Sequence, residues 1–96
     1  MKYETRSVYR PVPGQGENLS FTGTSAQSAV RRGGVYSLCP TQTCYIQLGT
    51  SPTATVGAGS MRIPANTLVY ITLHNGEEIA AIRETTDGIL NICLQQ

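Results

Sequence analysis

The segment from Thr67 to Gln95 constrains the fold more than any other part of the sequence. Three short apolar runs follow one another there, and the pairs Asn75-Gly76 and Asp87-Gly88 separate them. Two-residue Asn-Gly and Asp-Gly links between strand-like runs favour type I′ turns, whose twist matches that of paired antiparallel strands. The pattern therefore predicts a three-stranded antiparallel meander over these residues.

Strand-like alternation also occurs before this segment. Glu17–Thr24 alternates apolar and polar residues, and Val35–Cys39 with Thr43–Leu48 is expected to form a second hairpin. Between them, Ser25–Gly34 is a small-residue connection with room for one helical turn. With a short strand at Met61–Ile63, the sequence contains about seven short strands. This number and spacing predict an all-β fold, an antiparallel β-sandwich or a jelly-roll-like barrel.

The length of 96 residues fits a single domain. Residues 1–16 are expected to form an extended N-terminal arm, and residues 17–96 the β-sandwich domain. The first ten residues are mostly polar, and Pro11–Gly16 is rich in the Pro and Gly that interrupt regular elements. Two interpretations of the arm stay open: a frayed terminus, or an arm that docks on a neighbouring subunit through Tyr3, Val8 and Tyr9.

The composition indicates a neutral, hydrogen-bonding surface. Charged residues make up 14% of the sequence, against roughly 25% in ordinary soluble domains. Covering Thr, Ser, Gln or Asn costs less than covering an unpaired charge, so such a surface favours packing against other protein. The net charge is +1, and the cationic residues are spread along the chain as Lys2, Arg6, Arg10, Arg31, Arg32, Arg62 and Arg83.

This distribution supplies no basic stripe, so nucleic acid is not an expected partner. No apolar run approaches the roughly 20 residues of a membrane span, so a membrane is not expected either. The stretch Met1–Arg10 lacks the apolar centre of a signal peptide, which predicts a chain made and kept in a cytosol.

The three cysteines are interpreted mainly as reduced thiols packed within strands. A four-residue loop joins Cys39 to Cys44, which would place them opposite each other across the expected hairpin and within possible disulfide reach. Only Cys93 is left over, so the sequence has neither a four-ligand zinc set nor an even disulfide framework. A Cys39–Cys44 disulfide formed in an oxidising medium stays open as the alternative.

The sequence predicts no catalytic, metal or cofactor site. His74 is the single histidine and directly precedes the Asn75-Gly76 turn, so it is expected to be an exposed turn residue. Four carboxylates, Glu77, Glu78, Glu84 and Asp87, cluster in the same region. A carboxylate pair can serve glycoside hydrolysis, but solvated surface positions and a turn role account for these residues.

Tyrosines supply the alternative binding hypothesis. If Tyr36, Tyr45 and Tyr70 share one exposed face, they form a platform on which sugar rings stack, as in a carbohydrate-binding or host-adhesion module. Cross-strand aromatic packing is the more common role of such residues.

Four stretches carry a recognisable pattern: Tyr45–Thr55 with its Pro-Thr-Ala-Thr loop, Met61–Thr67 with its Pro-Ala-Asn-Thr turn, Glu78–Ile82, and Gly88–Ile92. Together they resemble a group of small proteins found in the structural gene sets of tailed bacteriophages and prophages. The resemblance covers about residues 30–95. Ile89 and Cys93 stand where that group often has Thr, and neither departure threatens the fold.

The resemblance implies a non-enzymatic virion component. A capsid decoration or cement protein on the head shell is the first expectation, and a neck or tail subunit is the alternative. Its partners would be the major capsid protein or other virion proteins, as a homo-oligomer or in many copies. Apolar positions in excess of one core, Val56, Leu68 and Tyr70, are expected to make the subunit contacts together with residues of the arm.

Overall fold

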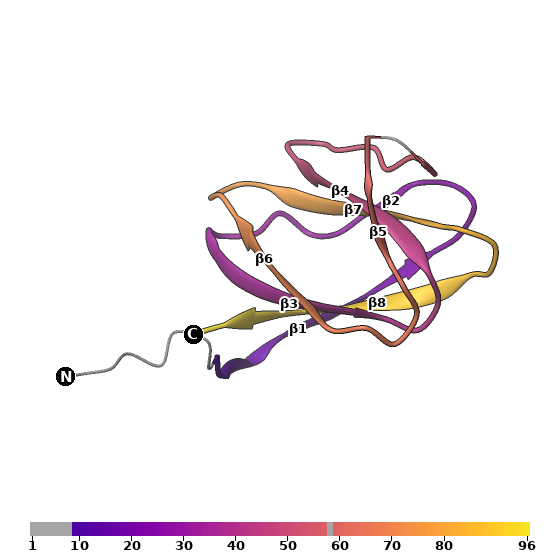
Figure 1. Cartoon of the computed structure of the whole chain (residues 1–96). Coiled ribbons are helices and arrows are strands. Elements are labelled where there is room, and N and C mark those ends of the chain that lie inside the picture. Colours follow the sequence, from indigo (N-terminus) through magenta and orange to yellow (C-terminus); the bar gives the residue numbers. More distant parts are fainter. Residues whose placement is uncertain (1–8, 58) are drawn as a thin grey trace.

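A computed structural model describes residues 9–57 and 59–96. This part of the chain is all-β, and its strands form two four-stranded antiparallel sheets that pack face to face (Figure 1). The predicted fold class is therefore confirmed. The strands are β1 Pro11–Phe21, β2 Ala26–Gln27, β3 Gly34–Pro40, β4 Cys44–Gly49, β5 Met61–Ile63, β6 Val69–Leu73, β7 Glu78–Arg83 and β8 Gly88–Gln95.

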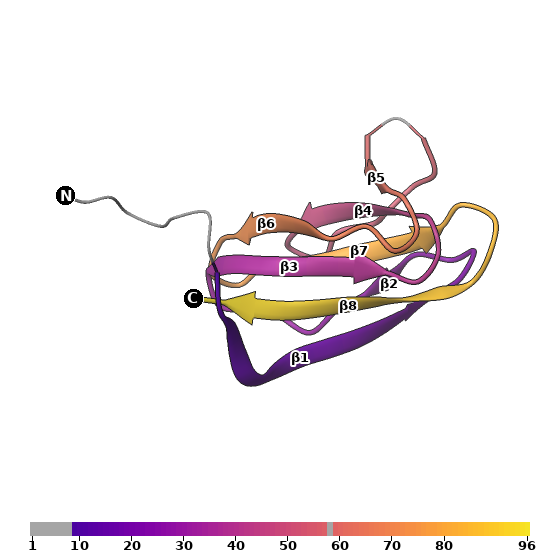
Figure 2. The ribbon, with the colours of Figure 1, turned by 60° about the horizontal axis from the view of Figure 1, so that its bottom comes forward.

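The strand order is that of a rolled-up hairpin. Sheet A has the order β1-β8-β3-β6, and sheet B has the order β2-β7-β4-β5. Strands β1 and β8, β2 and β7, β3 and β6, and β4 and β5 pair as they would in one long hairpin. Rolling this ribbon brings β3 against β8 and β4 against β7, and Figure 2 shows β3 lying between β8 and β6. This nested arrangement in two sheets is a jelly roll.

The predicted meander is wrong, because β6 and β8 belong to sheet A while β7 belongs to sheet B. A type I′ turn needs positive φ at both central residues. At the first link only Gly76 has positive φ (89°), and at the second neither Asp87 nor Gly88 does. Neither link is therefore a type I′ turn. Each link carries the chain from one sheet to the other. The second predicted hairpin is wrong for the same reason, since β3 lies in sheet A and β4 in sheet B.

The first strand begins earlier than the sequence indicated. Residues 11–16, predicted to be part of the arm, belong to β1, so the expectation that this stretch breaks any regular element is wrong. The register against β8 shifts between Pro11 and Gly16, which accommodates the extra residues as a bulge with Gly14 at φ 76°. An edge strand tolerates proline because one side of it needs no hydrogen-bonding partner.

The connection between β1 and β3 contains β2 and no helical turn within the described residues. Beyond β2 the connection stays bonded to β7 and to the residue before it, through Ser28 N to Ile79 O (2.8 Å) and Arg31 N to Glu77 O (2.9 Å). Backbone hydrogen bonding of this kind accounts for the absence of a helix here.

One core fills the space between the sheets. On β8 the alternation predicted from sequence holds, with Leu90, Ile92 and Leu94 buried and Asn91 pointing outward. The buried core consists of Leu19, Phe21, Tyr36, Leu38, Cys44, Ile46, Ile63, Leu73, Ile79, Ala81, Leu90, Ile92 and Leu94.

Gly88 allows β1 and β8 to approach closely at the end of the core. It pairs with Phe21, and a Cβ at this position would lie 2.7 Å from Phe21 Cζ and 2.9 Å from Thr41 Oγ1. Since Phe21 is fully buried and has no room to move, glycine is required here for space.

Candidate functional site

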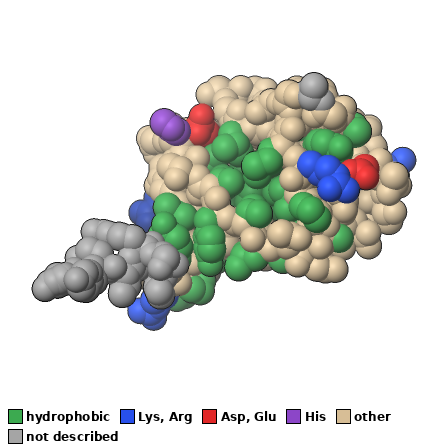
Figure 3. Space-filling model, viewed as in Figure 1, with side chains coloured by type: hydrophobic (Ala, Val, Ile, Leu, Met, Phe, Trp, Pro, Cys, Tyr) green, Lys and Arg blue, Asp and Glu red, His purple; other side chains and the backbone are tan. Residues whose placement is uncertain are grey.

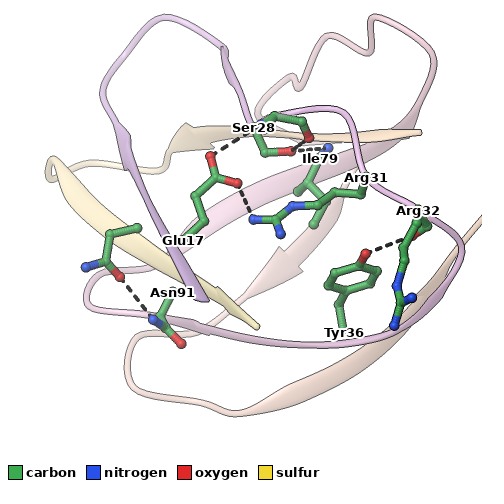
Figure 4. A network of polar contacts seen from close by, with 9 residues as sticks. Glu17, Ser28, Arg31, Arg32, Tyr36, Ile79 and Asn91 are labelled. Atoms are coloured by element: carbon green, nitrogen blue, oxygen red, sulfur yellow. Dashed lines mark hydrogen bonds and ion pairs between the residues drawn. The ribbon is translucent and has the colours of Figure 1, made fainter. Parts of the chain in front are cut away.

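The sandwich has two long sides where the sheets end. The side formed by the edge strands β1 and β2 is called the closed side here, because the polar side chains Glu17 and Arg31 bridge it (Figure 4). Glu17 extends from β1 and accepts hydrogen bonds from Arg31 Nη2 and from the backbone N–H of Ala29 (3.3 Å). Ser28 completes the bridge, because its Oγ accepts the N–H of Ile79 at 3.0 Å. Sheet A is thereby tied to sheet B.

Arg31 is held from a second direction. Its guanidinium carbon lies 5.5 Å from the ring centroid of Tyr36, and its side chain is 11% exposed. Tyr36 is itself fixed, since its hydroxyl donates to the carbonyl of Arg32 at 2.8 Å (Figure 4). Arg31 Nε is buried and makes no hydrogen bond. Glu17 is the anionic partner that offsets the burial of the guanidinium charge.

The opposite side, between the edge strands β5 and β6, is called the open side. Strand β5 pairs with Cys44–Ile46, so among the described residues no strand lies beside the part of β4 that carries Leu48. Leu48, Val69 and Ile71 pack against the core but stay partly exposed. In Figure 3 hydrophobic side chains cluster on the face that β5 and β6 present. The core is therefore less completely covered on this side.

The two outer faces of the sandwich also differ. The β4–β5 connection folds over the outer face of sheet B, where Pro52 and Ala54 are buried. Gln27 Nε2 donates to the carbonyl of Pro52 (2.7 Å), and the N–H of Ala54 donates to Ser25 Oγ (2.9 Å). This face is covered by the chain itself.

No such connection crosses sheet A within the described residues. The strand registers place no charged side chain among its outward-facing strand positions in the described part of the chain. Four of the polar ones bond in pairs: Asn91 Nδ2 donates to Asn18 Oδ1 and Gln95 Nε2 donates to Ser37 Oγ, both at 3.0 Å. This neutral outer face ends at β6 and joins the open side there.

The predicted contact residues lie at and near these surfaces. Leu68 (55% exposed) and Tyr70 (47%) lie just before and within β6, and Val56 (54%) lies in the β4–β5 connection. The Tyr9 ring packs against Tyr70 with centroids 5.1 Å apart. The exposure of these apolar residues agrees with the prediction, while their contacts with other subunits stay a prediction. Tyr3 and Val8 lie outside the described residues.

The tyrosine platform of the alternative hypothesis does not form. Tyr36 is buried in the core, Tyr45 is half-buried on the outer face of sheet B, and Tyr70 lies on the outer face of sheet A. The three rings are separated because Tyr36 and Tyr70 lie on opposite faces of sheet A and Tyr45 lies in the other sheet.

The two cysteines of the possible disulfide, Cys39 and Cys44, are free thiols in opposite sheets. Cys44 is fully buried, and desolvation raises the pKa of its thiol to about 11. A buried neutral thiol of this kind is a packing residue.

His74 is exposed at its turn, as expected. The backbone N–H of His74 donates to Glu77 Oε1 (2.7 Å), and the backbone N–H of Ser51 donates to Glu78 Oε1 (3.0 Å). Glu84 pairs with Arg62 (2.6 Å), and Asp87 pairs with Arg83 (2.5 Å). Each of the four clustered carboxylates therefore has a local structural partner.

Within residues 9–57 and 59–96 no pocket and no cluster of potential metal ligands is found. The same residues contain no helix long and apolar enough to cross a bilayer. The chain matches no protein-family model, no curated protein and no solved structure.

The sequence alone does not show that Leu48, Val69 and Ile71 border an open side. The stretch between Arg62 and Glu77 contains no Lys, Arg, Asp or Glu. This lack of charge indicates an exposed apolar edge only once it is known that β6 is the last strand of its sheet.

Proposed function

We propose that the protein is a non-enzymatic structural subunit of a tailed-phage particle, a decoration protein that covers and stabilises the head shell. The observation that carries the proposal is the apolar surface at β6, where exposed Leu68 and Tyr70 adjoin the partly exposed Val69 and Ile71 of the open side. Contiguous exposed apolar surface next to neutral polar surface marks a site of contact with other protein.

Two further observations support this function. The jelly roll is a fold that viral capsid proteins share with lectins and cupins, which is an analogy at the level of the fold. Residues 30–95 also carry the resemblance to phage structural proteins described above. A small subunit repeated over a shell adds many weak contacts, and their sum stabilises the particle even though each is modest.

The test uses particles from which the gene has been removed. We expect such particles to release their contents at lower temperature, and added wild-type protein to bind them and restore their stability. Leu68→Lys should reduce binding to particles, because it places a charge within the open side. Val30→Lys is the matched control, since Val30 is 66% exposed and lies in the β2–β3 connection, outside strands β5 and β6.

A map of the particle then assigns the location. Copies arrayed over the head shell, in contact with the major capsid protein, support the decoration role. Copies confined to the neck or tail would support the alternative role as a neck or tail subunit instead. Absence of the protein from purified particles would overturn both virion roles.

A further inference from the structure

Four strands form the edges of the two sheets, and three of them are poor templates for a further strand. Strand β1 carries Pro11, Pro13 and a bulge, and β2 has only two residues. Strand β5 has three residues, including the charged Arg62, and Pro64 follows it. Short length, proline, bulges and charge are the devices that prevent edge-to-edge pairing.

Strand β6 has none of these devices. Its five residues, Val-Tyr-Ile-Thr-Leu, contain no proline and no charge, and β-branched and aromatic residues of this kind favour pairing. It pairs with β3 along one edge, so alternate backbone N–H and C=O groups point away from the sheet on the other. Tyr9 covers the ring of Tyr70, which projects from the outer face of sheet A and not from this edge.

We propose that β6 pairs antiparallel with β6 of a second copy of this chain, so that two four-stranded sheets A become one eight-stranded sheet. The inference rests on the proposed function, because it names the partner that covers the open side. The pairing is isologous, since each copy offers the same strand to the other about a two-fold axis.

The absence of charge along β6 favours a second copy over a charged partner. In a symmetric pair each β6 residue lies opposite a residue of the same segment in the other copy. Any charged residue in this segment would therefore lie close to an identical charge. No Lys, Arg, Asp or Glu occurs between Arg62 and Glu77, so self-pairing of β6 brings no like charges together. A strand from a charged partner would find no counter-charge here.

The same pairing covers the apolar residues of the open side. Val69 and Ile71 point toward the core and lose their exposed fraction when a strand lies beside them. Tyr70 and Thr72 point to the outer face, and a two-fold axis perpendicular to the sheet keeps the neutral outer faces of both copies on one side. The dimer then presents a doubled neutral surface.

Sedimentation over a concentration series tests the pairing with the whole chain. We expect a reversible dimer for the wild type, and dissociation at least about tenfold stronger for Thr72→Lys, because an edge lysine introduces like charges beside the axis. Ser20→Lys is the matched control: Ser20 is equally an exposed outward residue of sheet A, but it lies on β1 at the far edge. It should leave the dimer unchanged.

Amide hydrogen exchange of the wild type gives a readout that needs no variant. Protection of the outward-pointing β6 amides should increase with protein concentration, while that of β1 stays constant. A monomer at every concentration, equal effects of the two lysines, or β6 exchange independent of concentration would each overturn the pairing.

The result separates this inference from the proposed function. Protein that binds particles but stays monomeric overturns the pairing and leaves the virion role. A dimer through β6 that is absent from particles supports the pairing and overturns the role.

Discussion

Along the closed side polar side chains bond to each other across the edge of the sandwich, whereas along the open side the apolar Leu48, Val69 and Ile71 stay partly exposed. Glu17 and Arg31 satisfy one another across the β1 and β2 edge. At the β5 and β6 edge, Val69 and Ile71 stay partly exposed on β6, whose outer edge pairs with no strand in the described residues. Stability of the isolated chain should therefore depend on the first side, and association on the second.

The largest effect is expected where β1 meets β8. Gly88→Ala should destabilise the chain by about 3 kcal/mol, because the new methyl group overlaps the immobile ring of Phe21. Gly16→Ala is the control on the same strand pair, since a Cβ there meets no atom within 4 Å. Urea unfolding measures both. Equal midpoints for the two variants would show that the approach of β1 to β8 is not tight.

The next effect concerns the ion pair of the closed side. Glu17→Ala should cost about 2 kcal/mol, because it leaves the largely buried Arg31 charge without its partner. Adding Arg31→Met to this variant should recover part of the loss, since methionine keeps the apolar contact with Tyr36 without a charge. Asn18→Ala, an exposed neighbour on β1, should change little. If the double variant is less stable than Glu17→Ala alone, the assigned role of the pair is wrong.

A matching change at β6, next to the open side, should cost less. Tyr70→Ala should lower the stability of the monomer by about 1 kcal/mol or less, because the side chain is half exposed and its main partner is the Tyr9 ring. Unfolding at low protein concentration measures this without a contribution from association. A double-mutant cycle with Tyr9→Ala isolates the ring contact. A loss as large as that of Glu17→Ala would contradict the proposed division between the two sides.

The smallest effect is expected from the exposed ion pair between Arg62 of β5 and Glu84. The hydrogen bond from Arg62 lowers the pKa of the Glu84 carboxyl below its ordinary value of 4.5. Because the folded pKa lies below the unfolded one, the pair stabilises the fold above about pH 4.5, and this contribution is lost as the pH falls through the folded pKa. The size is small because solvent screens the exposed charges.

An NMR titration of Glu84 in the wild type and in Arg62→Gln checks this shift. The Glu84 pKa should rise in the variant, and the stability difference between the two proteins should shrink on acidification. An unchanged pKa would show that the pair does not persist in solution.

The sequence predicted the strands better than their partners. Period-two alternation identified Leu90, Ile92 and Leu94 as core positions, because burial on one face of a strand is a local pattern. Sheet membership is not local: Asn75-Gly76 has the composition of a hairpin turn, yet it joins two sheets. Residues 11–16 were not predicted as a strand, because proline disrupts a central strand; an edge strand such as β1 tolerates it.

For the candidate site, the sequence correctly identified Leu68 and Tyr70 as apolar residues outside the core. It did not reveal that β6 ends a sheet, because strand order depends on the whole chain. The Glu17–Arg31 pair was also missed, since β2 lies between its members and only the rolled ribbon brings them together.

The nesting of the strand pairs has a consequence for biosynthesis. Arg10 and Gln96 exchange two backbone hydrogen bonds of 2.8 Å, so the earliest described residues are bonded to the latest. Until β8 has been synthesised, β1 has no strand to pair with, and sheet A lacks its second strand. Folding therefore waits until β8 is available and proceeds slowly, as expected when pairing is mostly long-range. All eight strands must be available before the molecule acquires a finished β6 edge to offer another.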